Sequence, residues 1–150
     1  MMRTLFLGIL LSTFCCGAIV TKAQAKDEWH QLSVQDAKES ALGQEKLRPE
    51  IGLYMKGQDH PKVMKTMGEY KTNQRTNGFG KSAQQACDRV FISALMALQD
   101  RAAKEGGNAV IDIYTITKDK KFESATEYSC IKGGFVTNVA LMGTVANIAK

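Results

Sequence analysis

The feature that most constrains the fold is a long helical pattern between Ala83 and Glu105. Small and apolar residues recur in it at spacings of four, three, four and four: Cys87, Phe91, Ala94, Leu98 and Ala102. This spacing places them on one face of a helix. Ser82 is the predicted N-cap, and Gly106-Gly107 is expected to end the helix. The chain therefore has one long helix whose apolar face must pack against other elements.

Extended segments lie on both sides of this helix. Alternating side chains and turn residues predict strands over 51–56, 63–72, 108–117, 124–132 and 135–148, the last being a strand pair or one long strand bent at Gly143. A short helix capped by Ser33, with Asp36 in its first turn, is expected to reach Leu42 and stop at Gly43. This order predicts an α+β domain in which one long helix packs on one face of a mostly antiparallel sheet.

The clearest predicted strand is 108–117. Alternation puts Ala109, Ile111, Ile113 and Thr115 on one side and Val110, Asp112, Tyr114 and Ile116 on the other. If the second side is buried, Asp112 needs a cationic partner such as Lys132. If that side is open to water, Asp112 needs none, and this second alternative is favoured.

The first 25 residues have the layout of an export signal. Arg3 is the positive start, residues 5–20 are an apolar run without charge, and Ala23-Gln24-Ala25 is a small-x-small exit. The apolar run is too short, and too close to the cleavage site, for a membrane anchor. We predict cleavage after Ala25, a periplasmic or secreted location, and one domain over residues 26–150.

The cysteines are interpreted from that location. Cleavage removes Cys15 and Cys16 and leaves Cys87 and Cys130 in an oxidising compartment, where a bond between them would join the helix to the sheet. A redox-active pair is the alternative, but such pairs favour Cys-x-x-Cys with exposed sulfur. Lipid attachment to Cys15 or Cys16 is another alternative. Phe14 argues against it, because a small residue normally precedes the modified cysteine.

The predicted mature chain has a nearly even charge balance. Two of the 20 basic residues, Arg3 and Lys22, lie in the removed segment, so 18 basic and 15 acidic side chains remain, a net charge of +3. No block of five or six like charges occurs, so no nucleic-acid partner is expected. The apolar residues 135–148 are short and rich in β-branched side chains, which favours a buried strand over a membrane span.

Few residues suggest chemistry. Gly80-Lys81-Ser82 looks like the end of a phosphate-binding loop, but Arg75 stands where its first glycine belongs, so a loop and a helix cap explain it. His60, Asp59 and Glu69 are too few ligands for a zinc site, so no metal site and no cofactor are expected. No catalytic triad order or His-Glu-x-x-His motif is present. The remaining ligand candidates are His60 and Asp112.

The junction after the helix resembles that of the YbjQ-like family. Residues 98–102 followed by Gly106-Gly107-Asn108-Ala109-Val110-Ile111 are similar to its alanine-rich helix and Gly-Ala-Asn-Ala-Val-Val strand, and Gly143-Thr144-Val145 is similar to its closing strand. The RcsF-like envelope lipoproteins have a similar Asn-Ala-Val junction and use disulfides.

The resemblance also extends, over about residues 33–148, to small exported bacterial proteins called "excinuclease ATPase subunit". The shared features are the signal peptide, the Gly-Lys-Ser helix start, Ala86-Cys87, the Gly-Gly-Asn-Ala-Val junction and Glu127-Tyr128-Ser129-Cys130. This resemblance implies the α+β fold and the disulfide. It does not imply nucleotide hydrolysis, because the phosphate-binding loop is incomplete.

These observations predict a non-enzymatic exported protein that binds an envelope protein, as an interaction or sensing module. One alternative is a small-ligand or metal-ion binding protein that uses His60 and neighbouring carboxylates. A second alternative is a homo-oligomeric scaffold, in which the long carboxyl-terminal strand pairs across subunits.

Overall fold

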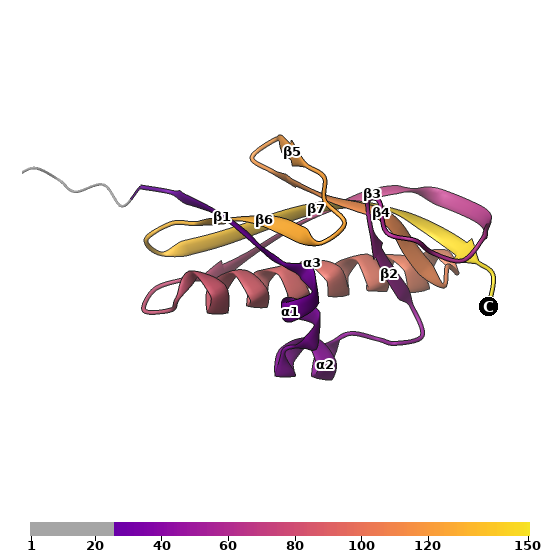
Figure 1. Ribbon diagram of the computed structural model, residues 1–150, viewed down its shortest axis with the longest axis horizontal. Helices are drawn as coiled ribbons and strands as arrows, with labels where there is room; N and C mark the ends of the chain where they lie inside the picture. The colour runs from indigo at the N-terminus through magenta and orange to yellow at the C-terminus, as the bar shows by residue number, and fades with distance from the viewer. Residues whose placement is uncertain (1–25) are drawn as a thin grey trace, which may run out of the picture.

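The computed structural model describes residues 26–150, which form an α+β domain (Figure 1). A seven-stranded sheet lies on one side of a long helix, and two short helices lie against the same helix. The elements in chain order are β1 Glu28–Ser33, α1 Val34–Glu39, α2 Ala41–Lys46, β2 Gly52–Met55, β3 Val63–Asn77, α3 Ala83–Glu105, β4 Ala109–Thr117, β5 Lys120–Phe122, β6 Glu127–Lys132 and β7 Val136–Ile148. The predicted fold class is confirmed. The predicted signal peptide lies outside the described residues.

Strand β7 is the centre of the sheet. β3 pairs with it along one edge, from Val63–Ile148 to Asn77–Val136. On its other edge, β4 pairs with the second half of β7 and β6 with the first residues. β1 pairs with the outside of β6, β2 with the outside of β4, and only the β2–β4 pair is parallel. Both edges of β7 are therefore occupied within one chain, so pairing between subunits would require another strand.

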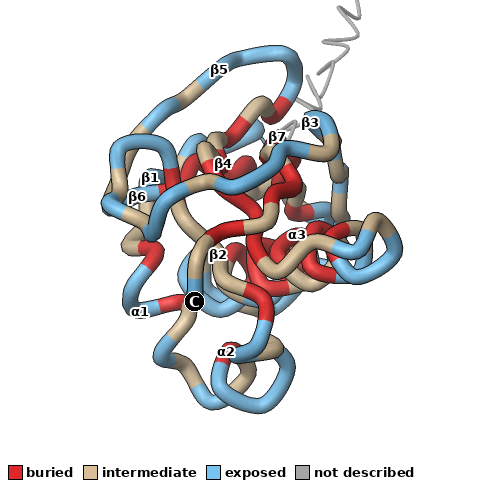
Figure 2. Tube along the Cα trace, turned by 90° about the vertical axis from the view of Figure 1, so that its right-hand side faces the viewer, coloured by how far each residue is buried: buried red, intermediate tan, exposed pale blue. Residues whose placement is uncertain are grey.

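Helix α3 has the predicted bounds, and its five stripe residues are all buried. Ser82 accepts a hydrogen bond from the Gln85 backbone N–H, and the Gln85 side chain accepts one from the Ser82 N–H, which completes a capping box. Burial extends beyond one stripe because α1, α2 and the segment after α2 cover a second side of α3. Figure 2 shows the buried residues gathered around this helix.

A disulfide between Cys87 and Cys130 joins the first turns of α3 to β6. Tyr128, two residues before Cys130, lies on the same face of β6 and is fully buried. Its ring stacks on Phe91 of α3, with 3.9 Å between ring centroids. Tyr128 and Cys130 therefore both point toward α3, and the helix and sheet are joined by a covalent bond and an aromatic stack.

The short amino-terminal helix differs from the prediction. It begins at Ser33 as expected, but it breaks at Ser40 into α1 and α2 and continues to Lys46. The Ser40 backbone closes α1, while its hydroxyl accepts a hydrogen bond from the Gly43 N–H and begins α2. Gly43 lies inside α2, so it does not end the helix. A serine that both ends one helix and caps the next has no distinct sequence pattern.

The predicted alternation of β4 is wrong beyond Ile111. Asp112 adopts a φ of 52°, and the pairing with β7 and with β2 shifts by one residue at this point. This β-bulge puts Val110 and Ile113 together in the main core, whereas Ile111 packs on the opposite face of the sheet. Ile111 and Ile113 therefore do not share a side.

Other strand boundaries also differ from the predicted ones. β3 continues five residues past the predicted end at Thr72, and β6 begins three residues later than predicted. Strands β1 and β5 were not predicted, because both are short, contain no buried residue and form through pairing with β6 and β4. Of the two alternatives for 135–148, the single long strand is observed. At Gly143 a Cβ atom would lie 2.6 Å from Val110 Cγ1, so only glycine permits this contact between β7 and β4.

Candidate functional site

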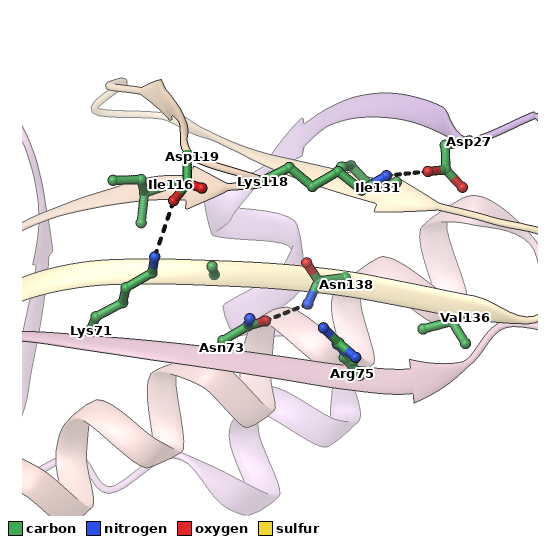
Figure 3. A pocket seen from close by; sticks show the side chains of 11 residues that line it. Asp27, Lys71, Asn73, Arg75, Ile116, Lys118, Asp119, Ile131, Val136 and Asn138 are labelled. Carbon is green, nitrogen blue, oxygen red and sulfur yellow. Dashed lines mark hydrogen bonds and ion pairs between the residues drawn. The ribbon is translucent and has the colours of Figure 1, made fainter.

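The candidate site is a hollow of about 370 Å³ on the face of the sheet opposite α3 (Figure 3). Side chains from β3, β4, β6, β7 and the β4–β5 turn, together with Asp27 before β1, surround it. Its lining residues are Asp27, Lys71, Asn73, Arg75, Ile116, Lys118, Asp119, Ile131, Val136, Asn138 and Ala140. The volume lies in the range of small-molecule sites, and the lining mixes an aliphatic floor with charged and amide groups.

One wall of the hollow is a row on β3. Lys71, Asn73 and Arg75 alternate along the strand, so their side chains share the face that α3 does not cover. Arg75 lies opposite Asn138 of β7 in the antiparallel register. The Asn138 side-chain amide donates hydrogen bonds to Asn73 Oδ1 and to the Gln74 carbonyl oxygen, which orients the amide groups of both strands.

The opposite wall forms where β4 and β6 diverge. β4 pairs with residues 141–146 of β7, whereas β6 pairs with Thr137 and Asn138 of the same edge, so the two strands form a fork. Two buried hydroxyl groups hold this fork. Thr115 Oγ1 accepts a hydrogen bond from the Ser129 N–H of β6, and Thr117 Oγ1 accepts one from the Ala140 N–H of β7. Beyond the fork, the β4–β5 hairpin rises above the sheet (Figure 1).

The turn of that hairpin carries two of the charged lining residues. Lys118 and Asp119 have φ angles of 49° and 59°, in the left-handed region that a two-residue hairpin turn of this type requires. Each non-glycine residue in this region costs about 1 kcal/mol or more. Backbone strain is therefore retained where Lys118 and Asp119 reach into the hollow.

The charges of the hollow do not balance. Lys71 Nζ lies 3.5 Å from Asp119 Oδ1, and Lys118 pairs with Asp27. Arg75 has no ion-pair partner among residues 26–150, and its guanidinium lies beside the Asn73–Asn138 pair (Figure 3). Three cations and two carboxylates line the hollow, so it favours an anionic group.

The backbone edge next to this hollow is also open. The register between β3 and β7 shifts twice before Gly68, but it is unbroken from Glu69 to Asn77. No other strand of the described chain pairs with β3, so the outer edge of this regular segment has unpaired backbone donors and acceptors. Its exposed side chains are Glu69, Lys71, Asn73, Arg75 and Asn77.

The two ligand candidates from the sequence lie outside the hollow. His60 follows β2, with its Nδ1 2.9 Å from the Pro61 carbonyl oxygen and its ring edge against Tyr54. Asp112 occupies the bulge with 45% of its side chain exposed, in keeping with the favoured alternative of contact with water, and its Oδ1 lies 3.4 Å from Lys56 Nζ and not beside Lys132. Within residues 26–150, no group of three or more His, Cys, Asp or Glu side chains is positioned to share a metal ion.

The residues that look like a phosphate-binding loop have structural contacts. Lys81 Nζ donates a hydrogen bond to the Asn77 carbonyl oxygen at 2.9 Å, and Ser82 is the helix cap described above. The interpretation of Lys81 and Ser82 as part of a loop and a cap is therefore confirmed. In the part of the chain that the structure describes, no helix is both long and apolar enough to cross a membrane.

Sequence reasoning did not find this hollow. The alternation of Lys71, Asn73 and Arg75 was readable, but the expected strand stopped at Thr72 and separated Lys71 from the other two. The opposite wall depends on a fork between β4 and β6 that has no local pattern. In comparisons with known proteins, no family model, no curated protein and no solved structure matches the chain.

Proposed function

We propose that this is a non-enzymatic exported protein that binds an envelope protein through β3 and the adjacent hollow. The observation that carries the proposal is the regular open edge from Glu69 to Asn77, bordered by an arginine without an ion-pair partner in the described chain. An added strand gains affinity from main-chain hydrogen bonds and specificity from side chains that meet alternate positions. The export signal predicted from residues 1–25 supports the envelope location.

Charge favours an acidic partner segment. From Glu69 to Asn77, β3 contains two cations, Lys71 and Arg75, and one carboxylate, Glu69, at the start of the segment, so the edge has a net positive charge. A carboxylate on the partner strand can form a two-hydrogen-bond contact with the Arg75 guanidinium. A second copy of this segment has the same net positive charge, so the charge distribution favours an acidic segment of a different protein over self-association.

The proposal is tested by capture from an envelope fraction with tagged residues 26–150 as bait. We expect one protein to be retained by the unchanged chain and lost with Arg75→Glu. Lys65→Glu is the matched control, because it makes the same change of charge on the irregular half of β3 and should leave capture intact. Equal capture by both variants, or catalytic turnover of a small substrate by the purified domain, would contradict the proposal.

The other two functions predicted from the sequence have distinct outcomes. A small acidic ligand in the hollow would raise the melting temperature by mass action without any protein partner, and Arg75→Glu would abolish that shift. A metal ion bound by His60 would give a shift that His60→Ala removes. A scaffold would have a solution mass of several chains. Each of these results would contradict the envelope-protein proposal and support the corresponding alternative.

A further inference from the structure

A second exposed surface lies at one end of the domain, where two loops meet. Five large hydrophobic side chains are exposed among residues 26–150, and three of them lie at this end: Phe79 at 67% and Phe135 at 70% in the loops, and Val136 at 51% as the first residue of β7. The Phe79 and Phe135 rings stack with 5.6 Å between centroids and 10° between planes. We call these three residues the aromatic tip. Single exposed apolar residues are common, but a cluster at a loop end requires a reason.

The loops hold the two rings outward. The Gly78 N–H donates a hydrogen bond to the Phe135 carbonyl oxygen, and the Phe79 N–H donates one to Asn77 Oδ1, each at 2.9 Å. Gly78 packs against Thr137, where a Cβ atom would lie 2.4 Å from Oγ1. The aromatic tip is therefore a fixed projection from packed loops, and the rings do not fold back onto the core.

The surroundings of the aromatic tip carry an excess of cations. The loop residues 78–82 and 133–135 contain Lys81 and no carboxylate, and Lys132 ends β6 next to them. Two carboxylates lie nearby: Glu28 is opposite Lys132 on β1, and Asp27, beside Gly133, pairs with Lys118. Exposed aromatic residues with adjacent lysines suit the interface of a bilayer with anionic headgroups, because rings enter the acyl boundary while ammonium groups stay at the phosphates.

The amino-terminal end of the domain lies at the same place. Glu28 pairs with Lys132, and a Cβ atom on Gly133 would lie 3.0 Å from Asp27 Oδ1. Figure 1 shows the start of β1, the β6–β7 turn and the β3–α3 loop at one end, whereas the carboxyl terminus is at the other. The described chain therefore begins at Lys26 beside the β6–β7 turn that carries Phe135.

We propose that the aromatic tip binds the surface of an anionic lipid bilayer, with Phe79 and Phe135 inserted at the interface and Lys81 and Lys132 at the headgroups. This contact is peripheral and leaves the open edge of β3 available. It orients the domain with the tip toward the membrane and the carboxyl terminus away from it. The proposal does not depend on an acidic partner at Arg75.

Residues 26–150 are used for the test, because they are the predicted mature chain and contain the disulfide. We expect cosedimentation with phosphatidylcholine vesicles that contain phosphatidylglycerol, and weaker binding to phosphatidylcholine alone or at high salt. Phe79→Ser with Phe135→Ser should reduce binding at least about tenfold. Met64→Ser is the matched control, because Met64 is 66% exposed but lies at the other end of β3.

A conservative variant keeps the test decisive if the double variant is poorly folded. Phe135→Trp should bind like the unchanged chain, and its fluorescence should shift to the blue and be quenched by brominated lipid. Lys81→Gln with Lys132→Gln should weaken binding to anionic vesicles only. Equal vesicle binding by the unchanged chain and the serine variant would overturn the proposal. A tip that contacts a protein, with no vesicle binding at any salt concentration, would also overturn it.

Discussion

The phenolic hydroxyl of Tyr128 donates a 2.7 Å hydrogen bond to Asp88 Oδ1, one residue along α3 from the disulfide-bonded Cys87. Asp88 also accepts two hydrogen bonds from the Gln84 side-chain amide. The first turns of α3 are thus held to β6 by a covalent bond, an aromatic stack and a charge-assisted hydrogen bond. This junction is close to the loop that carries the aromatic tip, so its rigidity supports that surface.

Tyr128→Phe should lower the free energy of unfolding by about 2 kcal/mol, because it removes a hydrogen bond to a charged acceptor but keeps the stack on Phe91. Chemical denaturation at neutral pH measures this change. Tyr114→Phe is a suitable control, since Tyr114 is only partly buried and has no hydrogen bond to Asp88. If Tyr128→Phe and Tyr114→Phe lower the free energy of unfolding equally, the hydrogen bond of the Tyr128 hydroxyl does not stabilise the fold.

The same tyrosine predicts a loss of stability at alkaline pH. Burial, the hydrogen bond to Asp88 and the charge of Asp88 raise the pKa of Tyr128 in the folded protein. An unfolded tyrosine ionises near about pH 10, so above that pH the unfolded state loses a proton that the folded state retains. The Tyr128 contribution is therefore complete below about pH 10 and falls as the pH rises. The stability difference between the unchanged protein and Tyr128→Phe should shrink over this range, and a constant difference would contradict the assignment.

Removal of the disulfide should destabilise the domain more than any single hydrogen bond. The bonded cysteines are 43 residues apart, and closing a loop of this length is worth about 4 kcal/mol in the chain-entropy model. We expect Cys87→Ala with Cys130→Ala to lower the melting temperature under non-reducing conditions. A reductant should lower that of the unchanged protein and leave the variant unaffected. Equal melting temperatures for the unchanged protein and the variant, both measured without reductant, would contradict a stabilising role of the disulfide.

Gln99 is a buried polar connection between α3 and the segment before β2. Its amide donates to the carbonyl oxygens of Arg48 and Ile51, and its oxygen accepts from the Arg48 N–H. Gln99→Leu should cost about 3 kcal/mol, because three backbone groups lose their partner. Asp100→Ala is the control. It removes an exposed ion pair with Arg48 and should cost less than about 1 kcal/mol. Similar effects of both changes on chemical denaturation would contradict this account.

The parts of the fold that were predictable depend on local patterns. α3 was predicted to the residue because its cap, its apolar spacing and its terminal glycines all lie within one continuous segment. The bulge at Asp112 was not predictable, since an aspartate with positive φ looks like an alternating strand residue until its neighbours on β2 and β7 are known. β1 depends on pairing with a strand about a hundred residues later in the chain.

The candidate site was harder to predict from the sequence for the same reason. Its β3 wall follows from strand alternation alone, but the other wall combines Asp27 with the turn after β4 and with β6. The aromatic tip likewise joins Phe79 and Phe135, which are separated by the whole of α3, β4, β5 and β6. Each loop shows an exposed phenylalanine beside glycine, and only the tertiary fold brings the two rings together.

The most direct test of the proposed function is photo-crosslinking from position 73 in cells that make the protein. A photoreactive amino acid replaces Asn73, which lies between Lys71 and Arg75 on the open face of β3. The control position is Lys104, exposed near the end of α3. Binding through β3 predicts an adduct with one envelope protein from position 73 and none from position 104. No adduct from position 73, the same adduct from both positions, or an adduct with a second copy of this chain would contradict it.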